Sequence, residues 1–267
     1  MPHPIERLRW VARAEGAGPS LLVREAAEAL ASVGDDLPGM VTACRRLIDR
    51  HPQAGPMWWL GARVLAAHDR VGEAYQAADE LDADPTPEVV AARLPEDATV
   101  TVLGWPEQVA AALRHRGDLQ VLVVDTLGEG SALAARLRGA GVDAEAVAEA
   151  GAGSAVRAST LVLLEATAGG REGFVAASGS LAAAAVGAGL GLDVWVVAGV
   201  GRVLADWLWE ALVIRLGDAG DPWERDHEVV PLDWVTSVVG PEGAQVPCDA
   251  VAGADCPVVP ELLRWGS

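Results

Sequence analysis

From about residue 98 onward the sequence alternates short apolar runs with segments of helical periodicity. The runs lie at residues 100–103, 121–124, 161–164 and 194–198, and a weaker strand pattern lies at residues 144–147. The run Val121-Leu122-Val123-Val124 is apolar at every position, as is typical of a strand buried on both faces. Helices are expected between the runs, at residues 107–114, 132–138, 154–158 and 179–189. This alternation predicts an α/β fold in which helices cover both faces of a parallel sheet.

The first 84 residues have a different pattern, which predicts a helical domain. Apolar residues recur at helical spacing over residues 21–30, 40–50, 58–67 and 73–81. The sequence Asp84-Pro85-Thr86-Pro87 follows, and two prolines so close together interrupt any regular element. We therefore expect an N-terminal helical domain over residues 1–84 and the α/β domain over residues 85–267.

Composition excludes several classes of function. The chain has 38 acidic and 20 basic residues, and a surface with a net charge of −18 repels the phosphates of nucleic acid. All the basic residues are arginines, so no site can use a lysine Schiff base. Five scattered histidines and three cysteines without Cys-x-x-Cys spacing predict neither a metal site nor a disulfide, and fit the reduced thiols of a cytoplasmic protein.

One uncharged stretch, residues 174–192, is long enough for a membrane span. It consists mainly of alanine and glycine, which gain little from contact with lipid. A buried helix is therefore predicted for it, and no membrane partner is expected.

Ligands of parallel α/β sheets bind where the strands end, and the clearest candidate there is Ser178-Gly179-Ser180. A serine N-cap followed by glycine allows backbone N–H groups to approach a phosphate or a hydroxyl-rich ligand closely. Ser178, Gly179 and Ser180 are thus predicted ligand-binding residues, and an ordinary helix start is the other interpretation. Asp125 and Thr126, which follow the run at 121–124, are candidates to bind ligand hydroxyls, or else they cap the next turn.

Two glycine-rich segments complete the candidates. Gly199-Val200-Gly201-Arg202 begins like a dinucleotide-binding fingerprint, but Leu204 stands where the third glycine would be, so a tight strand-to-helix turn is preferred. Arg202 remains a candidate contact for an anion. Gly16, Gly18 and Ser20 precede the first helix and form either a phosphate cradle or a plain helix start.

Several segments, in order along nearly the whole chain, resemble the regulatory-subunit superfamily of translation initiation factor 2B, which includes aldose–ketose sugar-phosphate isomerases. They are Gly16-Ala17-Gly18 with the helix after it, residues 55–60, Val123-Val124-Asp125-Thr126, residues 174–182, residues 194–198 with Arg202, and residues 238–243. The resemblance implies a helical domain followed by a Rossmann-like parallel-sheet domain of the NagB/RpiA/CoA-transferase-like class. It also implies a homodimer, a pocket for a phosphorylated sugar or nucleotide, and no cofactor.

The same resemblance indicates where this chain departs from the isomerases. They use a cysteine after the first strand and an aspartate after the fourth. Here the first position reads Leu103-Gly104-Trp105, and the second is best matched by Thr167, with Glu165 close by. General acid–base catalysis needs two titratable groups at one substrate. We therefore expect an initiation factor 2B-like pseudoenzyme that binds a phosphorylated metabolite or a protein partner in a regulatory role.

Two alternatives stay open. One is a divergent sugar-phosphate isomerase that uses Asp125 or Glu165 as its catalytic group. The other is a structural subunit whose pocket is filled by Trp105.

Overall fold

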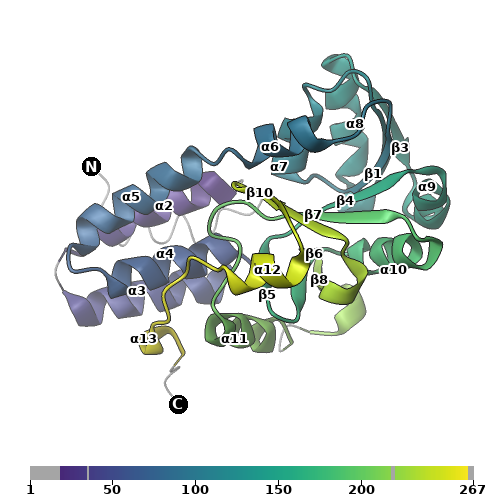
Figure 1. The fold of residues 1–267 in the computed structure, drawn as a ribbon. Coiled ribbons are helices and arrows are strands. Elements are labelled where there is room, and N and C mark those ends of the chain that lie inside the picture. Colours follow the sequence, from purple (N-terminus) through teal and green to yellow (C-terminus); the bar gives the residue numbers. More distant parts are fainter. Residues whose placement is uncertain (1–18, 35, 218–219, 264–267) are drawn as a thin grey trace. The chain divides into compact units, whose positions relative to one another are not determined.

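Figure 1 shows the fold in a computed structural model, which describes residues 19–34, 36–217 and 220–263. The chain divides into two compact units. The first combines the described parts of Met1–Asp84, Val200–Ala219 and Gly253–Ser267, and the second comprises the described parts of Pro85–Gly199 and Gly220–Ala252. The domain boundaries drawn from the sequence stay a prediction. Among the described residues, no helix has both the length and the apolar character needed to cross a bilayer.

The first unit is helical, as its periodicity predicts. Its helices are α2 (Pro19–Ala31), α3 (Leu37–Arg50), α4 (Gly55–Ala66), α5 (Arg70–Asp82), α11 (Asp206–Gly217) and α13 (Pro260–Leu263). Helix α4 is the centre of the unit, since ten of its twelve residues are buried, among them Trp58 and Trp59. Buried aromatic side chains contribute strongly to the stability of a core, because each removes a large apolar area from water.

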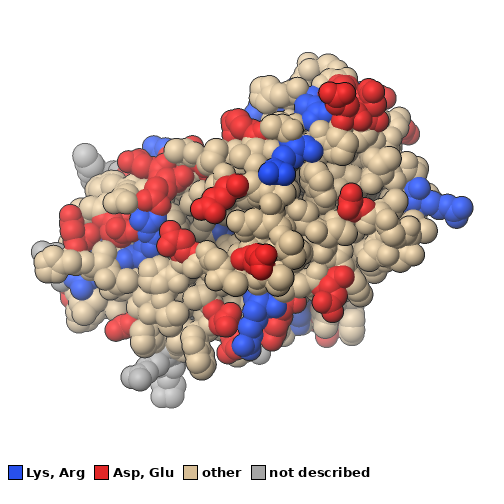
Figure 2. All heavy atoms as spheres, in the orientation of Figure 1, with Lys and Arg blue, Asp and Glu red and all other residues tan. Residues whose placement is uncertain are grey.

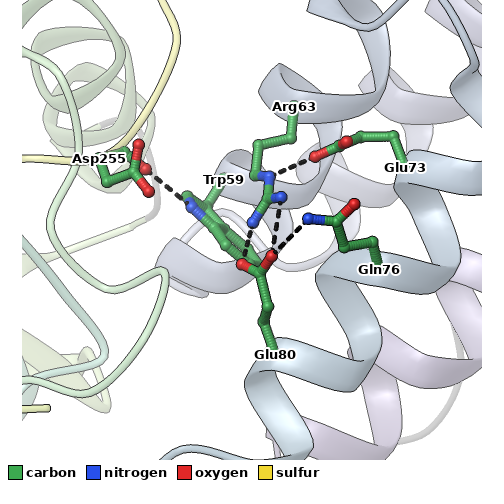
Figure 3. Close-up of polar contacts among 6 residues, drawn as sticks. All are labelled: Trp59, Arg63, Glu73, Gln76, Glu80 and Asp255. Atoms are coloured by element: carbon green, nitrogen blue, oxygen red, sulfur yellow. Dashed lines mark hydrogen bonds and ion pairs between the residues drawn. The ribbon is translucent and has the colours of Figure 1, made fainter.

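A network of charged groups joins α4 to α5 within this unit (Figure 3). The Arg63 guanidinium donates to Glu73 Oε1 at 2.5 Å and to both carboxylate oxygens of Glu80. It also lies over the Trp59 ring, with its central carbon 4.7 Å from the ring centroid. Burial disfavours the Arg63 cation, but the hydrogen bonds to Glu80 and Glu73 outweigh that effect and raise its pKa.

The second unit contains a seven-stranded sheet in the order β10-β9-β7-β4-β1-β2-β3. The strands are β1 (Thr99–Leu103), β2 (Gln120–Val124), β3 (Asp143–Val147), β4 (Leu161–Glu165), β7 (Asp193–Val197), β9 (Ser237–Gly240) and β10 (Gly243–Gln245). Every neighbouring pair is parallel except β9 and β10. The predicted α/β fold with a mainly parallel sheet is confirmed.

Helices cover both faces of this sheet. Figure 1 shows α6 (Thr86–Arg93), α7 (Glu107–Leu113) and α8 (Gly130–Gly139) on one face. It shows α9 (Ala152–Ala158) and α10 (Ser180–Leu190) on the other, and α12 (Pro247–Ala252) follows β10. Helix α6 begins inside the segment expected to interrupt regular structure, because a proline is tolerated in the first turn of a helix.

A second, antiparallel sheet corrects the helix predicted for residues 174–192. It consists of β5 (Ala168–Gly170), β6 (Gly173–Ala177) and β8 (His227–Pro231), and α10 begins only at Ser180. Gly173 allows β6 and β8 to approach each other closely, since a Cβ at this position would lie 2.3 Å from the Val230 carbonyl oxygen. The predicted helix is therefore wrong over its first residues.

Candidate functional site

Three segments predicted to line the site come together in the second unit. Gly179 has a left-handed backbone, with φ +92°. A Cβ at Gly179 would lie 3.1 Å from the side chain of Leu103, at the end of β1, and 3.5 Å from Thr126 Oγ1, just after β2. The ends of β1 and β2 and the start of α10 therefore adjoin, and Ser178 and Ser180 flank the contact along the chain.

Asp125 holds the start of α8. Its Oδ2 accepts a hydrogen bond from the Ser131 hydroxyl at 2.6 Å, and its Oδ1 accepts one from the Ser131 backbone N–H at 3.2 Å. These hydrogen bonds lower the pKa of the Asp125 carboxyl. Of the two interpretations of Asp125, the geometry favours capping of the next helix. A carboxylate held in this way is a poor proton donor at neutral pH.

Glu165 has a comparable place at the end of β4. Its Oε2 accepts a hydrogen bond from the backbone N–H of Val109, in the first turn of α7, at 3.0 Å. The negative charge of Glu165 lies at the N-terminus of α7, where the helix dipole is positive, so the carboxylate and the helix stabilise each other. The two carboxylates considered for catalysis thus each contact the start of a helix.

A third carboxylate contacts the start of α10, and sequence reasoning missed it. Glu228, in β8, accepts a hydrogen bond at Oε1 from the backbone N–H of Leu181 at 2.6 Å. The strand pair β6–β8 places it there by setting Ala176 opposite Glu228. One of the backbone N–H groups predicted to bind a phosphate at this helix, that of Leu181, is therefore already bonded to a carboxylate of the protein itself. Next to it, burial lowers the pKa of His227, so that its imidazole is neutral at pH 7.

The predicted serine cap of α10 is corrected by the structure. The N-cap residue is Gly179, and no side chain caps the helix from that position. The Ser178 backbone N–H instead donates to the Asp226 carbonyl oxygen at 2.8 Å, and Ser180 is buried.

Thr126 has an unmet hydrogen-bonding capacity. Its side chain is 1% exposed, and its Oγ1 has no hydrogen-bond partner within the described part of the chain. Buried hydroxyls in folded proteins nearly always have a partner. The Thr126 hydroxyl, next to Gly179, is therefore a buried polar group of this site that no described side chain or backbone group satisfies.

Val200, Gly201 and Arg202 belong to the first unit. Gly201, with φ +71°, lies against the Trp59 ring, where a Cβ would be 2.9 Å from ring atoms. The Val200 N–H donates to Asp84 Oδ2 at 2.8 Å, and Arg202 is buried and engaged in a contact. Gly201 thus allows the Trp59 ring to pack directly against the backbone, which agrees with the tight turn preferred for this segment.

Gly16 and Gly18 lie outside the described residues, and so does the side chain of Ser20. The described residues include no group of three or more His, Cys, Asp or Glu side chains that could hold a metal ion. Burial raises the pKa of Cys44 to about 12 and that of Cys256 to about 11, which keeps both thiols protonated and unreactive.

Comparisons with known proteins identify the fold. No protein-family model matches the chain, and no curated protein matches it in sequence. The chain is similar in structure to the translation initiation factor eIF-2B of Pyrococcus horikoshii, with a TM-score of 0.77 and 16% identity over 94% of this chain and 100% of that one. It is also similar to eIF2B beta from Chaetomium thermophilum, with a TM-score of 0.73 and 17% identity over 99% of this chain and 94% of that one.

These relatives and the topology define the class of protein: a helical unit combined with a mainly parallel α/β unit. A third similar structure, the delta subunit of eIF-2B from A. fulgidus, has a TM-score of 0.59 and 15% identity over 94% of this chain and 90% of that one. The chain has the fold of the initiation factor 2B subunits, and the resemblance predicted from its sequence motifs is confirmed at the level of the fold.

Proposed function

We propose that this chain is a non-catalytic, initiation factor 2B-like protein that acts by binding a protein partner in a regulatory role. The observation that carries the proposal is the 2.6 Å hydrogen bond between Glu228 Oε1 and the Leu181 N–H. The start of a helix attracts an anion, and here a carboxylate of the protein already bonds to one of its N–H groups. A phosphate beside it would meet like-charge repulsion. Asp125 and Glu165 have the same effect at α8 and α7.

An exposed apolar face on α11 supports a protein partner. Trp207 is 61% exposed and Ile214 is 65% exposed, and their spacing of seven residues puts them on one face of the helix. Leu208, Trp209 and Leu212 occupy the buried face. Exposed aromatic and aliphatic side chains that lie together are typical of protein interfaces.

We infer that the partner is a second copy of this chain, so that the protein is a homodimer. A structure of this fold from C. thermophilum, with a TM-score of 0.71 and 17% identity over 93% of each chain, is described as a tetrameric eIF2B-beta2-delta2 complex. That protein therefore assembles from several subunits. Assembly of the present chain would remove Trp207 and Ile214 from water, which stabilises the complex.

We expect Trp207→Glu and Ile214→Glu each to convert the dimer into a monomer, because a charge without a partner in a dry interface is costly. Sedimentation velocity at micromolar concentration measures the mass. Leu190→Glu is the matched control, since Leu190 is also half-exposed, at 49%, and lies at the end of α10. A wild-type protein that sediments as a monomer, or variants that keep the wild-type mass, would contradict the homodimer.

We expect Glu228→Ala to gain phosphate binding that the wild type lacks, because it frees the Leu181 N–H at the start of α10. Thermal unfolding with inorganic phosphate and ribose 5-phosphate tests this. For each protein, the midpoint temperature of unfolding with ligand is compared with the midpoint without ligand. A ligand at a hundred times its Kd adds about 2.7 kcal/mol to the free energy of unfolding. Glu149→Ala, which removes an exposed carboxylate from the same unit, is the control. Stabilisation of the wild type by a sugar phosphate would overturn the proposal.

Binding of a small uncharged, hydroxyl-rich ligand is a second candidate function, favoured by the unpartnered Thr126 hydroxyl. Neutral sugars in the same thermal screen test it, with Thr126→Val expected to abolish any shift. Turnover of an aldose phosphate that is lost in Asp125→Asn or Glu165→Gln would instead establish the divergent isomerase.

A further inference from the structure

We propose that a groove between α7 and α8 binds a small aromatic anion, that is, a flat ring that carries a carboxylate or phosphate group. The groove has a volume of about 240 Å³ and lies entirely within the second unit. Its apolar lining includes Ala110, Leu133 and Leu137. The proposal goes beyond the protein-binding function, because the groove shares no residue with α11.

Trp105 provides a flat surface at the groove. It follows β1 and is 36% exposed, which is unusual for so large an aromatic side chain. The Arg136 guanidinium lies over this ring, with its central carbon 5.7 Å from the ring centroid. A ring that stacks against the exposed part of Trp105 would therefore also have a cation within reach.

The charge of the groove differs from that of the chain as a whole. The chain has a net charge of −18, and Figure 2 shows acidic side chains scattered over the visible face. Yet Arg114 and Arg136 both line the groove, and neither forms an ion pair with an acidic side chain of the described residues. Two guanidinium groups that line an apolar cavity and are not paired with a carboxylate are suited to bind an anion. Glu107 also lines the groove and is engaged in a contact of its own.

The volume accommodates about one ring system, so only the base of a nucleotide would fit inside the groove. Pockets for drug-sized ligands are about 300–1,000 Å³, so a cavity of about 240 Å³ is smaller than that range. Two kinds of ligand have the required aromatic ring and anionic group. One is a simple aromatic acid, and the other is a mononucleotide, which has both features in its base and its phosphate.

The test uses the full-length protein labelled with ¹⁵N, in which the indole N–H of Trp105 is assigned from the signal missing in Trp105→Phe. We expect millimolar 4-hydroxybenzoate to shift this signal, whereas 4-hydroxybenzamide, which has no charge, and acetate, which has no ring, leave it unchanged. Adenosine monophosphate is the second arm. Tighter binding of the nucleotide than of 4-hydroxybenzoate identifies a nucleotide as the source, and the reverse order identifies an aromatic acid.

Arg114→Ala and Arg136→Ala are each expected to weaken this binding about tenfold, which corresponds to about 1.4 kcal/mol. Arg157→Ala is the matched control, because Arg157 is an exposed arginine on α9 in the same unit, outside the groove. The proposal is overturned if neither anion shifts the Trp105 signal, if the benzamide titrates like the benzoate, or if all three arginine variants bind alike.

Discussion

Replacing Gly130 with alanine is expected to lower the free energy of unfolding by about 3 kcal/mol. Gly130 is the first residue of α8 and lies against the end of β2. A Cβ there would be 2.6 Å from the Val124 carbonyl oxygen and 2.7 Å from the Asp125 Cα. Both are backbone atoms of a buried strand end, so no side-chain rotation can relieve the overlap. Either α8 or the end of β2 must move.

Gly139→Ala is the matched control for Gly130→Ala, because it makes the same change in the same helix. A Cβ at Gly139 would meet no atom within 4 Å. Alanine has the higher helix propensity, so this variant is expected to raise the free energy of unfolding by up to about 1 kcal/mol. Denaturation with guanidinium chloride measures both. Equal effects of the two substitutions would show that Gly130 is not required by the close approach of α8 to β2.

The strands β1, β2 and β4 were predicted from the sequence to within one residue at each end. They are buried at nearly every position, and burial on both faces is what their largely apolar runs indicate. The antiparallel sheet was missed because β5 is only the short segment Ala-Gly-Gly, which contains none of the β-branched or aromatic residues typical of strands. Gly169 is needed there because the Phe174 ring packs directly against its backbone. A three-residue strand has too little pattern to be recognised.

The candidate site was predicted in part. Thr126 follows a strand of the parallel sheet, so it was expected at the edge where ligands bind, and it lies beside Gly179. Gly179 follows β6 of the antiparallel sheet, which the sequence pattern did not reveal. The role of Glu228 could not be predicted, because 47 residues separate it from Leu181 and only the β6–β8 pairing joins them. Local patterns identify a helix start, but they do not reveal which distant side chain will occupy it.

The second large effect is expected in the helical unit, where Arg63→Met should lower the free energy of unfolding by about 3 kcal/mol. The Arg63 side chain is only 12% exposed and is bonded to Glu73 and Glu80. Removing the cation leaves two partly buried carboxylates without a partner, which costs more than the loss of an exposed pair. The contact with the Trp59 ring is lost as well.

Arg24→Met is the control for Arg63→Met. Arg24 pairs with Asp82 of α5 in the same unit, but its side chain is 52% exposed. Its loss should therefore cost less than about 1 kcal/mol.

The dependence of the free energy of unfolding on pH tests the role of the Arg63 charge further. The hydrogen bond from Arg63 lowers the pKa of Glu80 below its usual 4.5. The stability this pair contributes is therefore complete above the unfolded-state pKa and is lost as the pH falls through the folded-state value. The difference between wild type and Arg63→Met, measured by denaturation in urea, should shrink as the pH is lowered. A difference that stays constant down to acid pH, or an equal loss in both arginine variants, would mean that the Arg63 side chain stabilises α4 and α5 through packing and not through its charge.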